Sequence, residues 1–314
     1  MPASYVHQCA AAEACDALSL FSSPTLRSAV LAGSEGPDPF FFSVVPTPGT
    51  PLVPKLGLTI HTQRTDDFML ALADACAGSE LTRAYCCGFF THYGTDTTIH
   101  PFIYAHSMAP DGGYSSTLHC TLEHQLETLF FRRQGNAAGL PVQMAGFAQL
   151  HSKEKDAIAQ ALNTAIDKVF PKASIGAFRV RRSFDDAVQL CRLLRSESGK
   201  KFRTLGAVLR PFHLDAPLHA HMMPVNPPET DIANESHTPW ASIWKPEQMR
   251  QESFFDLFAA AVQRNQTLIA AVSDYMAGRT SAESLRALHG GLCYDSGLPW
   301  QSACPAKKAP SVQK

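Results

Sequence analysis

The chain has 314 residues, of which 45% are hydrophobic and 18% are charged, and its formal net charge at pH 7 is −1. This length suffices for one large domain or two small ones with an ample core. The near-zero net charge argues against electrostatic binding to nucleic acid or to an anionic membrane surface.

The N-terminal segment lacks the pattern of a secretory signal. No Lys or Arg precedes Arg27, and Glu13 and Asp16 interrupt any apolar stretch. No apolar run approaches the roughly 18 residues of a membrane-spanning helix. Nine cysteines occur without a Cys-x-x-Cys spacing, so we expect reduced and mostly buried thiols. These features predict a soluble, cytoplasmic protein without a transmembrane segment.

The first sixty residues predict two helices followed by proline-rich loops. Helices are expected over residues 4–20 and 24–31, where apolar residues recur at helical spacing. In the run GSEGPDPFFF that follows, glycines and prolines exclude regular structure. Asp38, between two prolines, is expected in a rigid, extended turn. Residues 43–58 are expected to form a proline-rich loop.

The next segment predicts three helices that carry most of the chemistry. His61 is expected to precede a helix at about 64–77. A long helix over 81–105 follows, which Pro101 is expected to bend. A third helix is expected over 115–133, before basic residues and a glycine that are typical of a helix end.

The remainder also predicts helices. No alternation at a period of two residues occurs, so no sheet is predicted. A long polar loop is expected between Phe212 and Glu252, and residues 305–314 are expected to form a disordered tail. We therefore expect one all-α, multi-helix domain over residues 1–304. Its remaining helices are predicted at 152–168, 183–197, 200–210, 252–276 and 281–289.

Histidines and carboxylates recur at helical spacing on two of these helices. His92, Asp96 and His100 stand at i, i+4 and i+8 and span about 80° of one helix face. On the next helix, His119 and Glu123 stand at i and i+4. Zinc binds imidazole nitrogen and carboxylate oxygen in tetrahedral sets, and a helix presents two such ligands together at i, i+3 or i, i+4. The two helices are therefore expected to hold more than one metal ion.

Simpler interpretations exist for each of these residues taken alone. A single buried histidine is most often a core residue with a hydrogen-bond partner, and Asp38 alone is equally a turn-forming residue. The segment HAHMMP, with His219 and His221, also has metal-ligand chemistry, but no helix is predicted there to hold the two imidazoles. His106 and His124 lie off the two ligand faces.

Taken together, these motifs resemble the zinc-dependent phospholipase C family. The resemblance extends over residues 1–130 and, more loosely, over 225–262. Each motif alone is weak, whereas their order and spacing are specific. In chain order the motifs are Tyr5-Val6-His7, Gly36-Pro37-Asp38, the isolated His61, His92 to Pro101, His119 to Glu123, Asn226-Pro227, Trp240 and Ser253 to Leu257.

The resemblance implies the all-helical fold that this family shares with related nucleases, and a site with two to three zinc ions built mainly from residues 1–130. Asp38 is implied as a metal ligand, as the general base, or as both. The implied ligand sets are Asp38, His61, His92 and Asp96 for one zinc, His100, His119 and Glu123 for a second, and His7 for a third, with Asp96 as a bridge.

Three functions remain open at this point. The first is phospholipase C-like hydrolysis of a phosphodiester by a zinc-activated water, on a small phosphoester or phospholipid substrate and not on nucleic acid. The second is a nuclease or phosphomonoesterase on the same scaffold. The third is a non-catalytic helical module in which zinc is structural or in which no metal binds.

Overall fold

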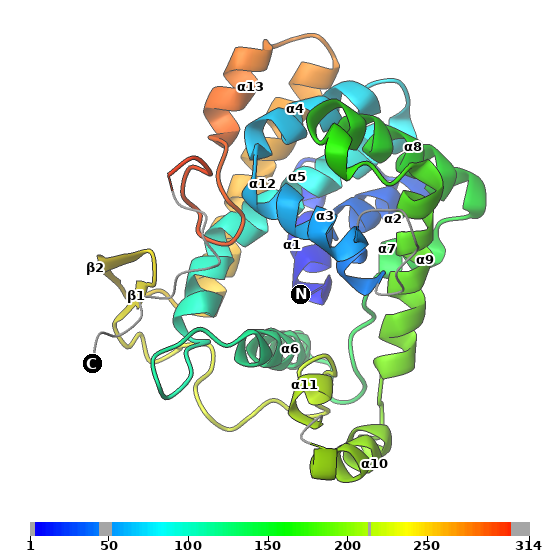
Figure 1. Cartoon of the computed structure of the whole chain (residues 1–314). Helices are drawn as coiled ribbons and strands as arrows, with labels where there is room; N and C mark the ends of the chain where they lie inside the picture. The colour runs from blue at the N-terminus through cyan, green and yellow to red at the C-terminus, as the bar shows by residue number, and fades with distance from the viewer. Residues whose placement is uncertain (1–3, 44–51, 213–214, 303–314) are drawn as a thin grey trace.

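The computed structural model of the chain describes residues 4–43, 52–212 and 215–302. Its regular structure is almost entirely helical (Figure 1), which confirms the predicted all-α class. In chain order the helices are α1 (Ser4–Ala17), α2 (Pro24–Gly33), α3 (Val53–Thr62), α4 (Thr65–Cys76), α5 (Glu80–Ala105), α6 (Ser116–Arg133), α7 (Ala145–Gln149), α8 (Ser152–Val169), α9 (Ala177–Leu194), α10 (Lys200–Leu209), α11 (Asp215–His219), α12 (Phe254–Met276) and α13 (Ala282–His289), with 3-10 helices η1 (Asp38–Phe42), η2 (Pro171–Ala173) and η3 (Arg210–Phe212).

Helix α5 forms the centre of the core. Ser79 caps its N-terminus by accepting a hydrogen bond from the N–H of Thr82. Its apolar side chains are buried in many directions, including those of Tyr85, Phe89 and Tyr93. A helix of this kind must be covered on several sides, and α2 and α12 lie along it (Figure 1). Polar side chains on α5 are therefore removed from bulk water.

The backbones of α2 and α5 are in direct contact. A Cβ atom at Gly88 on α5 would lie 2.1 Å from the carbonyl oxygen of Val30, and one at Gly33 on α2 would lie 2.0 Å from the carbonyl oxygen of Tyr85. Only glycine leaves room for such an approach. Gly88 thus opens one side of α5, and the element that approaches it is α2.

The prediction of a loop over residues 43–58 is wrong for the part of it that the structure describes beyond residue 51. Helix α3 begins at Val53 and contains His61 in its last turn. The proline of its first turn, Pro54, is compatible with a helix, because the N–H that proline lacks has no partner there in any case. His61 therefore lies in α3 and not in a loop, and it precedes α4 as predicted.

A second correction concerns the glycine- and proline-rich run before this helix. Asp38 begins the 3-10 helix η1, where no regular structure was expected. Pro39 occupies its first turn, where the fixed φ of proline favours a helical start. The Asp38 side chain is buried, so its position is set by a helical turn and not by an extended one.

The expectation that no sheet forms is also wrong, although the sheet is small. Strand β1 (Trp240–Ser242) pairs antiparallel with β2 (Lys245–Arg250) inside the predicted polar loop. The guanidinium of Arg250 lies 4.6 Å from the ring centroid of Trp240, a distance at which a cation and an aromatic ring attract each other. Trp240 also packs against Phe102 of α5, which fastens this hairpin to the core.

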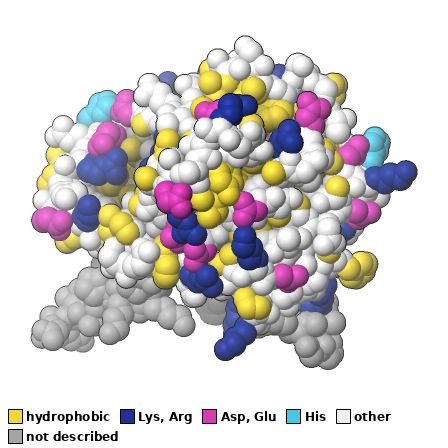
Figure 2. All heavy atoms as spheres, turned by 90° about the horizontal axis from the view of Figure 1, so that it is seen from above, with side chains coloured by type: hydrophobic (Ala, Val, Ile, Leu, Met, Phe, Trp, Pro, Cys, Tyr) yellow, Lys and Arg dark blue, Asp and Glu magenta, His cyan; other side chains and the backbone are white. Residues whose placement is uncertain are grey.

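Other predictions about the chain's organisation have mixed outcomes. Of the eight cysteines in the described residues, all but Cys9 are buried, as expected. Among the described residues, no helix combines the length and apolar character needed to cross a bilayer. On the face seen in Figure 2, basic and acidic side chains are interspersed. One domain over residues 1–304 stays a prediction, and the predicted tail at 305–314 lies outside the described residues.

Candidate metal centre

The predicted ligand side chains come from five elements and meet in one buried region. Helix α5 contributes three of them on one face, as its i, i+4, i+8 spacing predicts, and α6 contributes two. Helix α1, η1 and α3 contribute one each. All of these side chains are buried: His7, Asp38, His61, His92, Asp96, His100, His119 and Glu123.

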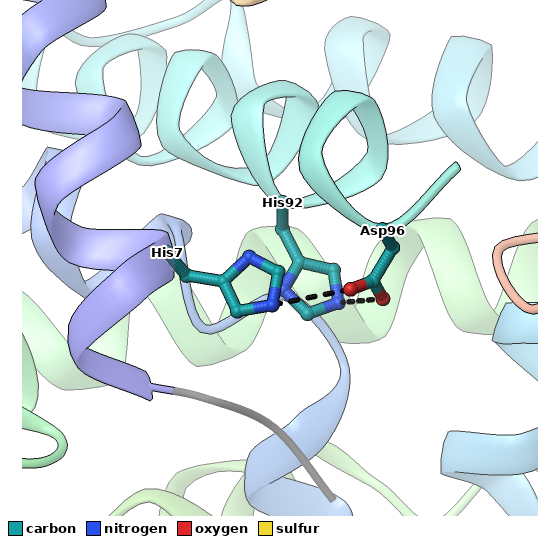
Figure 3. Close-up of side chains that lie close together, drawn as sticks. All are labelled: His7, His92 and Asp96. Carbon is teal, nitrogen blue, oxygen red and sulfur yellow. Dashed lines mark ion pairs between the residues drawn. The ribbon is translucent and has the colours of Figure 1, made fainter. Parts of the chain in front are cut away.

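The first cluster joins α1 to α5. Nε2 of His7 lies 3.1 Å from Oδ1 of Asp96, and Nε2 of His92 lies 2.9 Å from Oδ2 of the same carboxylate. Figure 3 shows both histidine rings directed at this carboxylate. The two rings are stacked, with their centroids 4.4 Å apart. Asp96 thus presents a different oxygen to each histidine.

The second cluster joins η1 and α3 to the same part of α5. Nε2 of His61 lies 3.2 Å from Oδ1 of Asp38, and Nε2 of His92 lies 3.7 Å from Oδ2 of Asp38. Nδ1 of His61 is 2.8 Å from the carbonyl oxygen of Gly57, and Nδ1 of His92 is 3.0 Å from that of Ser34. These carbonyls accept the Nδ1 proton, so each Nε2 keeps a free lone pair for a metal.

The third cluster joins α5 to α6. On α5 it uses His100, the last residue of the ligand row formed by His92, Asp96 and His100. Nε2 of His119 lies 3.2 Å from Oε1 of Glu123, and Nε2 of His100 lies 3.3 Å from the same oxygen. His100 also approaches Oδ1 of Asp96 at 3.5 Å. This last contact links the third cluster to the first, and Asp96 stands between them.

The distances within these clusters fit zinc. With metal–ligand bonds of about 2.0–2.2 Å in a tetrahedron, neighbouring ligand atoms lie roughly 3.3 Å apart, and the contacts above range from 2.9 to 3.7 Å. The geometry is not that of hydrogen bonds alone. Asp38 Oδ2, His92 Nε2 and Asp96 Oδ2 are buried without a hydrogen-bond partner. Because such atoms are costly inside a protein, a cation between them would offset an otherwise unexplained penalty.

The electrostatics of the clusters also favour a cation. Burial by itself raises the pKa of Asp96, but His100, His92 and His7 hold that pKa well below its usual range. Burial likewise raises the pKa of Glu123, and its histidine neighbours lower it well below the ordinary value. In His100, burial lowers the pKa while the carboxylates of Asp96 and Glu123 raise it to about 10. The carboxylates are therefore charged at neutral pH and attract positive charge.

A small cavity adjoins the first and third clusters. Its volume is about 20 Å³, which is enough for one water molecule. His7, Asp96, His100 and Glu123 form its polar side, and apolar residues that include Phe254 form the rest. A water molecule there would lie beside the candidate ligands, as a hydrolytic site requires.

The histidines set aside on sequence grounds lie in other surroundings. Nδ1 of His106 lies 2.9 Å from the carbonyl oxygen of Phe102. Nδ1 of His124 faces the carbonyl oxygen of Cys120 on its own helix. His219 stacks on Phe202 and approaches its carbonyl oxygen. None of these three belongs to a cluster with metal-binding geometry among the described residues.

The segment after α13 brings two residues to the centre that sequence reasoning missed. The Tyr294 ring packs against His61, with centroids 5.0 Å apart, and against His92 at 5.9 Å. Oδ1 of Asp295 lies 3.9 Å from Nδ1 of His100. No helical spacing connects these residues to the ligand row, so the sequence offers no local signal for them.

Comparison with known proteins places the chain in a family. A model of the family described as zinc dependent phospholipase C matches residues 6–175. No curated protein and no solved structure matches the chain significantly. The matched region contains all eight candidate ligands and covers more than half of the chain. The chain belongs to the zinc-dependent phospholipase C family.

Proposed function

We propose that the chain is a phosphoester hydrolase that cleaves a phosphodiester in the manner of a phospholipase C, using a zinc-activated water. Membership of the family supports a zinc-dependent hydrolase. The observation that carries the proposal is the convergence of three His/carboxylate clusters, two of which share His92. Separate structural zinc sites would not need to share a ligand.

The proposed ligand sets follow the contacts between the side chains. In the set proposed for the first ion, the imidazole nitrogens of His61 and His92 lie 2.9 to 3.7 Å from the carboxylate oxygens of Asp38 and Asp96. Asp96 then bridges to His7, which gives the chain two or three zinc ions in neighbouring positions. The sets are Asp38, His61, His92 and Asp96 for the first ion, His100, His119 and Glu123 for the second, and His7 with the bridging Asp96 for the third.

Bound zinc would supply a Lewis acid that polarises a phosphoryl oxygen and lowers the pKa of water to about 7. The chain's own residues prepare that chemistry. Gly57 and Ser34 carbonyls hold the His61 and His92 rings in place through Nδ1. Oδ2 of Asp38, buried and without a hydrogen-bond partner, is the oxygen we assign as acceptor of the proton from the attacking water.

The charge of the site suits an anionic substrate. Two Zn²⁺ ions carry more positive charge than the ligand carboxylates of Asp38, Asp96 and Glu123 neutralise, so the ions together with their ligands are net positive. A phosphodiester oxygen is attracted to such a site, and the charge that develops on it during attack is stabilised. We therefore propose a small phosphoester or a phospholipid as the substrate. Buried thiols such as those of Cys76, Cys86 and Cys87 support a cytoplasmic location, where thiols stay reduced.

A substrate panel with and without chelator tests this function. We expect hydrolysis of phosphocholine diesters, loss of activity on chelation, and recovery when zinc is added back. Preferential cleavage of single-stranded DNA or of mononucleotides would assign the centre to a nuclease or phosphomonoesterase instead. Full zinc occupancy without hydrolysis of any of these compounds would contradict the proposal and favour a non-catalytic helical module.

A further inference from the structure

The chain returns to the candidate centre after α13, nearly two hundred residues after the ligand row (Figure 1, red). The N–H of Tyr294 donates a hydrogen bond of 2.9 Å to the carbonyl oxygen of His61. Residues Cys293 and Leu298 are joined by a hydrogen bond of 2.8 Å, and Gly297 donates to the carbonyl of Cys293. These bonds fold residues 293–298 into a tight turn against the site.

The turn is pressed against α5 next to the ligand row. Gly297 has a φ of +64°, and a Cβ atom there would lie 2.5 Å from the carbonyl oxygen of Thr97. Four residues further along α5 stands Pro101, whose missing N–H cannot donate to that carbonyl. The freed carbonyl and the glycine together allow the backbone of the turn to approach α5 closely. The turn thereby holds the Asp295 side chain beside His100.

Asp295 faces the side of His100 opposite the candidate metal. Nε2 of His100 is directed to Glu123 and Asp96, and Nδ1 lies 3.9 Å from Oδ1 of Asp295. The Asp295 side chain is only 9% exposed. Its Oδ2 and Nδ1 of His100 are both buried without a hydrogen-bond partner. His100 Nδ1 thus faces the Asp295 carboxylate, one oxygen of which has no hydrogen-bond partner.

The two histidines of the first proposed zinc position have a partner at Nδ1 that His100 lacks. In His61 and His92, Nδ1 is held by a backbone carbonyl at 2.8 and 3.0 Å. In metal sites a second partner of this kind orients the ring and increases the basicity of the ligating nitrogen, and it is often a carboxylate. Among the described residues, no backbone carbonyl accepts a hydrogen bond from Nδ1 of His100. The carboxylate of Asp295 lies on that side of the ring instead.

We propose that Asp295 is the positioning residue of the second zinc position, accepting the Nδ1 proton of His100 and directing Nε2 toward the metal. This inference rests on the proposed function. The 3.9 Å separation exceeds a direct hydrogen bond, so in the loaded protein the gap is closed by a small rotation of the ring or bridged by one water molecule. Asp295 touches neither the substrate nor the metal in this arrangement and acts through His100.

The test is the affinity for zinc of the full-length protein with Asp295→Asn and Asp295→Ala. Asn retains an acceptor oxygen without the charge, and Ala retains neither. We expect both variants to lose zinc to a competing chelator more readily, with about a 10–100-fold weaker affinity for one ion and a larger effect for Ala. The unfolding temperatures of the chelator-treated variants are measured alongside, so that a loss of zinc affinity is separated from a loss of stability.

A matched control separates positioning from anchoring of the segment. Asp66 accepts a hydrogen bond of 2.8 Å from Nε1 of Trp300, and it pairs with Arg286. It therefore anchors the same C-terminal part of the chain without facing a candidate ligand. Asp66→Asn should lower the unfolding temperature with and without zinc, and it should leave the zinc affinity unchanged.

The possible results separate the two proposals. If wild-type protein binds no zinc, the proposed function fails. If the wild type binds zinc and hydrolyses a diester, but Asp295→Asn and Asp295→Ala bind zinc as tightly as the wild type, only the positioning role is overturned. A fall in the unfolding temperature of chelator-treated variants with unchanged zinc affinity would likewise make Asp295 merely structural.

Discussion

His7 on α1 and Asp96 on α5 are far apart in the chain, yet Nε2 of His7 lies 3.1 Å from Oδ1 of Asp96. The other oxygen of this carboxylate lies 2.9 Å from Nε2 of His92. Because its two oxygens face different histidines, Asp96 can serve two neighbouring cations at once. A carboxylate at a single site would direct both oxygens to one partner or leave one to solvent, but Asp96 is buried.

Replacing the bridging carboxylate should affect more than one ion. Asp96→Asn removes the negative charge shared by the first and third proposed zinc positions, so we expect the variant to lose at least one zinc ion per chain. Elemental analysis of dialysed protein measures this loss. The matched control is His106→Ala, because His106, at the C-terminal end of α5, faces the carbonyl oxygen of Phe102 and packs on its ring. Unchanged zinc content in Asp96→Asn would contradict the bridging role.

Replacing the proposed proton acceptor should abolish catalysis and spare the fold. Asp38→Asn is expected to lower kcat by about 10²–10⁴-fold, the usual contribution of a general base. The assay uses saturating zinc, because Asp38 is also a proposed ligand. Circular dichroism should show unchanged helix content, since only the short helix η1 contains this residue. Activity within a few-fold of the wild type would remove Asp38 from the mechanism.

The contact between α2 and α5 predicts a strong effect of a single methyl group. Gly88→Ala would place its Cβ 2.1 Å from the carbonyl oxygen of Val30. Since both groups are on buried helix backbones, the helices must move apart, at a cost of about 1–3 kcal/mol or more. Urea unfolding measures the change. Gly78→Ala is the control, because nothing lies within 4 Å of a Cβ at that position, and its stability should equal or exceed the wild type's.

The sequence reveals those parts of the centre whose residues are close together along the chain. His92, Asp96 and His100 lie on one face of α5, as their spacing predicts, because helix geometry alone determines that arrangement. His7 and Asp38 come from separate elements, and only the family resemblance placed them with the row. Their convergence depends on how α1, η1 and α5 pack, and no local pattern encodes that packing. Whether they bind zinc stays a prediction.

The errors of the sequence interpretation have physical causes as well. Several prolines near residue 54 predict a loop, but the first turn of a helix tolerates proline. Helix α3 therefore begins at Val53 and includes His61. Asp295 was missed because its relation to His100 is created by a turn packed on α5, with Gly297 at the point of contact. A periodicity search detects neighbours along one helix and not contacts between distant segments.

A buried carboxylic acid beside the centre should make stability depend on pH. Burial raises the pKa of Glu35 to about 8, although hydrogen bonds from Ser4 and Gln8 to its Oε1 oppose this shift. In the unfolded chain the pKa has its ordinary value near 4.5. Between these two values the folded protein keeps a proton that the unfolded chain has lost. The stabilisation is therefore complete below about pH 4.5 and is lost progressively as the pH rises toward 8.

Glu35→Gln should remove most of this dependence. The amide keeps the oxygen that accepts from Ser4 and Gln8 and never ionises. We expect the free energy of unfolding of chelator-treated protein to fall less between about pH 5 and pH 9 in the variant than in the wild type, so that the variant is more stable at the alkaline end. Urea unfolding at several pH values measures the difference. Parallel pH profiles for the two proteins would show that Glu35 is already ionised when folded.

The zinc content of the purified, full-length chain tests the central claim most directly. Elemental analysis after exhaustive dialysis should find two or three zinc ions per chain in the wild type, because two of the three clusters share His92 and the third adjoins them through the contact between His100 and Asp96. Fewer than two zinc ions per chain would contradict the account, since a single ion would leave buried carboxylates and imidazoles facing one another without the charge that their arrangement requires.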